Sequence, residues 1–86
     1  MSLTKAKALF EWAITQEPEY PMFYYNLACA FAEMGNRDQT LKNLRLAYKY
    51  KGNMISGENF PDPKEDSSFS KYLQDKEFSA ELGKMR

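Results

Sequence analysis

The amino-acid sequence predicts an all-α fold built from short antiparallel helical hairpins, and three observations support this prediction. Apolar side chains in residues 24–31 recur at the three- and four-residue spacing that places them on one face of a helix. A second stripe of the same kind lies within residues 41–48, after a turn that contains Gly35 and Asn36. A connection this short makes two helices antiparallel, with their stripes facing each other. We therefore expect about three main helices and one or two short C-terminal helices.

The central hairpin has a clear start and stop for each helix. Pro21 suits the first turn of a helix, where a missing N–H costs little, and Gly35 provides the permissive backbone of a helix end. Asn36 is placed to cap the second helix, with Gln39 as the answering half of a capping box. The two apolar stripes consist of Tyr24, Leu27, Ala28 and Phe31 in the first helix and of Leu41, Leu44, Ala47 and Tyr48 in the second.

These residues resemble a tetratricopeptide repeat, a helical hairpin of about 34 residues. The resemblance rests on Tyr24-x-x-Leu27-Ala28-x-x-Phe31, then Gly35, then Ala47, and on a second partial copy, Ala6-x3-Phe10-x2-Ala13 followed by Pro18. It implies a short solenoid, with the second helix of a partial repeat over residues 3–18 and a full repeat over residues 20–52. Thr40 and Gly52 depart from the small Ala and the closing Pro of the family.

The C-terminal part has a different character. Residues 53–66 hold two prolines, a glycine and an acidic cluster without helical period, so we expect a loop. The run Asp66-x2-Phe69-x2-Tyr72-x2-Asp75-x2-Phe78 resembles a tail that follows many bacterial tetratricopeptide units, in which aromatic anchors fill the groove that another repeat would occupy. We expect short capping helices over residues 67–84. The chain then forms one domain, residues 1–86, and we expect it to be a fragment of a longer protein.

Charge and composition exclude several classes of function. The formal net charge is zero, which gives no overall attraction to nucleic acid or to anionic lipid. An aromatic platform for nucleic acid at Phe23 to Tyr25 is disfavoured because Tyr24 belongs to the core stripe. The second helix is basic and residues 58–66 are acidic, and two interpretations stay open: two solvated surfaces, or an intramolecular contact between loop and helix.

The sequence offers little catalytic chemistry. It contains no histidine, which removes histidine-based catalysis and mixed zinc sites. Asp62, Glu65 and Asp66 lack the spacing of a calcium-binding loop. Cys29 is expected to be a small packed residue, and a single cysteine fits a reducing compartment. We expect no enzyme activity, cofactor, metal site or membrane span, and a cytoplasmic location.

The predicted function is protein–protein interaction. The resemblance implies that the first helix of the hairpin lines a concave, partner-binding face, and the residues off its packing stripe are Met22, Tyr25, Asn26, Cys29 and Glu33. We expect this groove to bind a peptide or protein. In some members of the family an asparagine at the place of Asn26 helps to hold a terminal carboxylate, which is a further reading of that residue.

A structural role is the alternative: an end cap of a longer repeat array, or a weak homodimer through the open N-terminal half-repeat. Leu9, Trp12 and Ile14 would then leave apolar area uncovered. An exposed Trp12 favours self-association or truncation, whereas a covered Trp12 favours a monomeric binding module.

Overall fold

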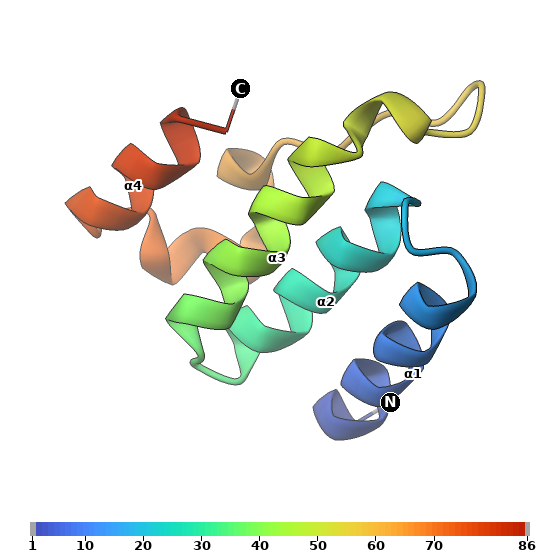
Figure 1. Ribbon diagram of the computed structural model, residues 1–86. Helices are drawn as coiled ribbons and strands as arrows, with labels where there is room; N and C mark the ends of the chain where they lie inside the picture. The colour runs from blue at the N-terminus through green and yellow to red at the C-terminus, as the bar shows by residue number, and fades with distance from the viewer. Residues whose placement is uncertain (1, 86) are drawn as a thin grey trace.

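The computed structural model describes residues 2–85, which form helices and turns with no strand among them. The α-helices are α1 (Leu3–Gln16), α2 (Pro21–Glu33), α3 (Arg37–Lys49) and α4 (Lys76–Gly83). Three short 3-10 helices are η1 (Lys51–Asn53), η2 (Pro63–Glu65) and η3 (Ser67–Tyr72). In Figure 1, α1, α2 and α3 lie side by side, and the chain then returns behind α3 and places α4 on its far side. The all-helical class predicted from the sequence is confirmed.

The turn between α2 and α3 shows why the hairpin forms at this point of the chain. Gly35 has a φ of 81°, a left-handed conformation in which a side chain would be strained. The N–H of Gly35 donates to the carbonyl of Ala32, and that of Asn36 donates to the carbonyl of Phe31, which together end α2 in a Schellman motif. The Asn36 side chain then accepts from the N–H of Gln39 at 3.1 Å and caps α3.

The capping box expected between Asn36 and Gln39 is only half formed. The Asn36 side chain caps the helix as predicted. The backbone N–H of Asn36 already donates to the Phe31 carbonyl at 2.9 Å, so it does not donate to the Gln39 side chain. The end of one helix has therefore taken the group that the start of the next would have used.

The core lies between α2, α3 and the C-terminal segment. Small residues let α2 and α3 approach closely, because Ala28, Ala32 and Ala47 are completely buried. Phe69, Phe78 and Leu82 complete the same cluster from η3 and α4. By contrast, α1 contributes only Ala13 to the buried residues. The molecule is well covered on its C-terminal side and much less so along α1.

The observed elements refine the predicted boundaries. α1 ends at Gln16, so residues 17–18 of the predicted partial repeat lie in the turn that follows the helix. The predicted loop over residues 53–66 contains the single turn η2, which begins at Pro63 and is capped by the Asp62 side chain. Residues 67–84 hold two short helices, η3 and α4, whose caps are the side chains of Asp66 and Asp75.

Candidate functional site

Three of the five predicted groove residues on α2, namely Tyr25, Cys29 and Glu33, contact the C-terminal segment of the same chain. Tyr25 is only 2% exposed. Met22, Asn26 and Cys29 are half-buried, and Glu33 is exposed. We call residues 60–82, which lie against this face and against α3, the tail. The structure thus brings the predicted residues to one surface, and the tail covers most of that surface.

Tyr25 is the centre of this contact. Its hydroxyl donates to Asp66 Oδ2 at 2.9 Å, and its ring meets the rings of Phe60 and Phe69 edge-on, each at a centroid distance of 5.7 Å. Burial, and then the hydrogen bond to Asp66, raises the pKa of the Tyr25 phenol well above its usual value of 10.0. Such a buried side chain anchors the tail, and it is not exposed to a partner while the tail is docked.

Of the remaining groove residues, Cys29 and Glu33 contact the tail. The Cys29 Sγ lies 3.8 Å from Asp66 Oδ2, and the Ser68 hydroxyl donates to Glu33 at 3.4 Å. Burial, and then the Asp66 carboxylate, raises the pKa of the Cys29 thiol to about 12, so the thiol stays protonated and unreactive at neutral pH. Asn26 is half-buried and its side chain makes no hydrogen bond within residues 2–85.

A second pair of aromatic rings fixes the tail further along. Phe78 is completely buried and stacks on Tyr72 with the ring centroids 5.1 Å apart. The Tyr72 hydroxyl donates to the carbonyl of Ala32 at 3.3 Å. The expected docking of aromatic anchors is confirmed by the burial of Phe69 and Phe78. Sequence reasoning did not identify Phe60 as a residue that packs against α2 and α3. The only feature that could have indicated this is its aromatic side chain, directly before Pro61 in the loop.

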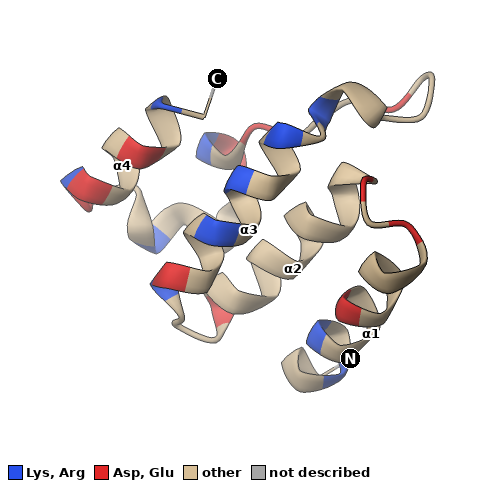
Figure 2. Cartoon of the chain, in the orientation of Figure 1, with Lys and Arg blue, Asp and Glu red and all other residues tan. Residues whose placement is uncertain are grey.

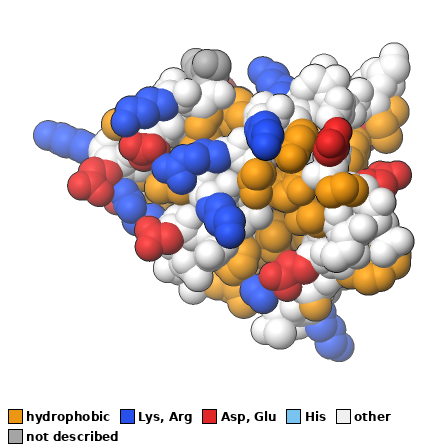
Figure 3. Space-filling view, viewed as in Figure 1, with side chains coloured by type: hydrophobic (Ala, Val, Ile, Leu, Met, Phe, Trp, Pro, Cys, Tyr) orange, Lys and Arg blue, Asp and Glu red, His pale blue; other side chains and the backbone are white. Residues whose placement is uncertain are grey.

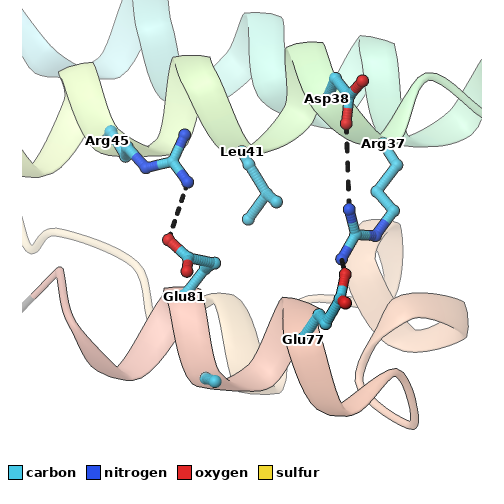
Figure 4. Close-up of a pocket in the computed structure, with 7 residues that line it drawn as sticks. Arg37, Asp38, Leu41, Arg45, Glu77 and Glu81 are labelled. Carbon is cyan, nitrogen blue, oxygen red and sulfur yellow. Dashed lines mark hydrogen bonds and ion pairs between the residues drawn. The ribbon is translucent and has the colours of Figure 1, made fainter.

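Ion pairs join α4 to α3 across the hollow drawn in Figure 4. Arg37 binds Asp75 at 2.9 Å and Glu77 at 3.2 Å, and Arg45 binds Glu81 at 2.9 Å. The backbone N–H of Phe78 and then Arg37 lower the pKa of Asp75. Arg45 likewise lowers the pKa of Glu81.

The basic helix therefore finds its carboxylates in α4. Among the described residues, no carboxylate of residues 58–66 forms an ion pair with α3. Glu58 instead accepts a hydrogen bond from Tyr20 at 2.6 Å, and Asp66 accepts from Tyr25. The loop does contact the helix, because the Phe60 ring lies 4.9 Å from the ring of Tyr48, but the carboxylates that pair with Arg37 and Arg45 come from Asp75 and Glu81.

The outer face of α1 carries the largest exposed apolar side chain. Trp12 is 61% exposed and Leu9 is 47% exposed, and Ala8 beside them is exposed as well. Ile14, the third residue of the expected apolar set, is half-buried against the core and points away from this face. We call Ala8, Leu9 and Trp12 the α1 face. By the criterion given above, an exposed Trp12 argues against a closed monomeric binding module.

Within residues 2–85, the His, Cys, Asp and Glu side chains form no cluster of three or more that could hold a metal ion. In the same range, no helix has both the length and the apolar character that crossing a bilayer requires. Comparison of the chain with protein-family models, with curated proteins and with solved structures finds no match. Function must therefore be argued from the contacts and surfaces of this molecule.

Proposed function

We propose that this chain is a non-catalytic protein-association module of the tetratricopeptide type, and that the α1 face joins it to a second copy of itself. The observation that carries the proposal is the exposure of Trp12 and Leu9 on a helix whose opposite side is packed on α2. A large aromatic side chain held out on a rigid helix is typical of the centre of an interface.

The proposed repeat gives a physical reason for the exposure of the α1 face. Positions 34 residues apart correspond, so Leu9 and Trp12 match Asn43 and Leu46 of α3. Asn43 is 5% exposed, and Leu46 packs against the core. In α3 the preceding helix α2 covers this side, and Tyr50 stacks on Tyr24 there. The equivalent side of α1 has no preceding helix among the described residues, which leaves its apolar residues in contact with solvent.

The charges along α1 favour a second copy as the occupant. Lys5 lies in its first turn and Glu17 directly after its end, whereas Lys7 and Glu11 between them pair with each other at 3.2 Å (Figure 2). Two such helices packed antiparallel would place the basic end of each against the acidic end of the other. The apolar residues would meet at the middle. The arrangement is self-complementary, as a two-fold interface requires.

Analytical ultracentrifugation over a range of concentrations tests this proposal. We expect the wild type to associate reversibly and Trp12→Ala to remain monomeric, while Ile55→Ala, which removes an equally exposed apolar side chain elsewhere, still associates. Because Trp12 is the only tryptophan, its emission should shift to shorter wavelength as the dimer forms. A monomeric wild type at all concentrations would overturn the proposal.

A charge exchange tests the antiparallel geometry separately. Lys5→Glu should weaken the dimer, because it sets like charges against each other, and Lys5→Glu combined with Glu17→Lys should restore it. If the double variant is weaker than the single one, the helices do not meet antiparallel. Both variants change only exposed side chains, so circular dichroism should show an unchanged fold.

A second candidate function is the binding of a partner segment in the α2 groove of Met22, Tyr25, Asn26, Cys29 and Glu33. The observation in its favour is that the groove already holds the start of η3, a segment of the tail, through Asp66 and Phe69. A partner would have to replace this segment. The rate at which a thiol reagent modifies Cys29 measures how often the tail releases, because the thiol lies under Asp66. If Cys29 reacts only as fast as the whole protein unfolds, the groove is closed to partners.

We also propose that the protein is located in the reducing cytoplasm, because Cys29 is a free thiol.

A further inference from the structure

A row of basic residues runs along the outer side of α3 and into η1, and α4 neutralises only part of it. The row consists of Arg37, Lys42, Arg45, Lys49 and Lys51. Figure 2 shows its positions along α3, and Figure 3 shows basic side chains over the same helix, beside a band of hydrophobic surface over α2. Arg37 and Arg45 pair with α4. Lys49 and Lys51 are exposed, and neither has an ion pair within residues 2–85.

Two shallow hollows lie on either side of Tyr48 at this unneutralised end. The first is bounded by Tyr48 and Met85, with Lys49 and Lys84 at its edge. The second is bounded by Tyr48 and Phe60, with Lys51 at its edge. The Lys51 ammonium lies 5.5 Å from the centroid of the Phe60 ring and 5.9 Å from that of Tyr48. Each hollow is therefore lined by apolar or aromatic side chains together with a lysine that has no ion pair within residues 2–85, Lys49 in the first and Lys51 in the second.

We propose that this surface, the α3 basic surface (Tyr48, Lys49, Lys51, Phe60 and Met85), binds an acidic segment of a partner protein that also carries an apolar side chain. Carboxylates of such a segment would pair with Lys49 and Lys51, and its apolar side chain would enter a hollow beside Tyr48. The chain already contains the same recognition in one instance, because Glu81 of α4 binds Arg45 at 2.9 Å at the edge of the first hollow. The surface combines the end of α3 with Lys51 of η1, Phe60 and Met85, and none of its residues belongs to the α1 face.

The surroundings of the two hollows favour a protein over nucleic acid. Glu81 lines the first hollow and Asp62 lines the second, and both carboxylates would repel a phosphate backbone. The formal net charge of zero gives no long-range attraction to a polyanion. A short acidic segment needs only the few cations that are present, and it can place an uncharged side chain where Asp62 and Glu81 lie.

Fluorescence anisotropy with a short labelled peptide of alternating glutamate and phenylalanine tests the proposal. Three ligands are compared: this peptide, the same peptide with glutamine in place of glutamate, and labelled oligothymidine. The protein variants are Lys49→Glu with Lys51→Glu, and a matched control with the same change of charge, Lys71→Glu with Lys76→Glu, whose exposed lysines line neither hollow. Trp12→Ala separates this site from the α1 face.

We expect the acidic peptide to bind the wild type, the control and the Trp12→Ala variant with similar affinity, and more weakly as salt is added. The Lys49→Glu/Lys51→Glu variant should bind it about tenfold more weakly, because two favourable contacts become repulsive. Absence of binding to the wild type, equal binding of the glutamine peptide, or equal binding by the two charge variants would overturn the proposal. Tighter binding of oligothymidine than of peptide would overturn it in favour of nucleic acid.

Discussion

Removal of the Phe69 ring is the most direct test of the docked tail. Phe69 is completely buried, and its ring meets Tyr25 edge-on at 5.7 Å. In Phe69→Ala the space left behind would lie under the segment that carries Asp66, so the hydrogen bond from Tyr25 would lose its support as well. The substitution therefore affects both the packing and the polar anchor of the tail.

The expected cost is about 3–5 kcal/mol, which is typical of a large aromatic side chain removed from a core. For a chain of 86 residues, a total stability of about 4–13 kcal/mol is expected. One substitution would thus remove a large share of the total. With an m-value of about 1–2 kcal/mol/M, the urea midpoint should fall by roughly 1.5–5 M. Phe69→Leu, which keeps most of the volume, should lose about 1–2 kcal/mol and remain folded.

Urea unfolding followed by far-ultraviolet circular dichroism measures this loss, and the reactivity of Cys29 reports on the tail itself. Ile55→Ala serves as the control, because Ile55 is 60% exposed and its removal should change stability by less than about 0.5 kcal/mol. A loss below about 1 kcal/mol for Phe69→Ala, with unchanged Cys29 reactivity, would show that the tail does not depend on this anchor. That result would refute the packing argument.

Three further predictions concern the backbone and pH. Gly35→Ala should cost about 1–2 kcal/mol in urea unfolding because Gly35 is left-handed, whereas Gly83→Ala should cost nothing. Folding raises the pKa of Cys29 from 9.0 to about 12, so the thiol's contribution to the free energy of unfolding is complete below pH 9.0 and is lost as pH rises toward 12. Cys29→Ser should flatten this part of the curve of stability against pH. Folding lowers the pKa of Asp75 from 3.8, so the carboxylate's contribution to the free energy of unfolding is lost as pH falls below 3.8. Arg37→Ala should lose less stability over this pH range than the wild type does.

The helices were predictable because their signals are local. The spacing of Tyr24, Leu27 and Phe31, and the Gly35–Asn36 pair, define a hairpin without knowledge of the rest of the chain. These are properties of neighbouring residues along the chain. The burial of Phe69 and Phe78 was expected on different grounds, from the resemblance of residues 66–78 to a capping tail.

The surface of α2 was harder to predict, because the helical period assigns a residue to a face and does not say what covers that face. Tyr25 lies off the stripe that packs on α3, as expected, yet it is buried by Asp66 and Phe60, which lie 41 and 35 positions later. The same limit applies to Arg37 and Arg45. Their basic character was plain, but acidic residues in two segments were available as partners, and only the path of the tail selects α4.

The hydrogen bond from Tyr25 to Asp66 also has a consequence for synthesis of the protein on the ribosome. The hairpin is complete at Lys49 and Asp66 follows 17 positions later, so at about 5–20 residues per second the finished hairpin waits roughly 1–3 s before its partner segment has been made. Helices form within microseconds, and the α2 surface therefore stays bare for most of that time. A nascent chain at this stage presents the same aromatic and small residues that the tail later covers, and it is then that chaperones or aggregation would compete for it.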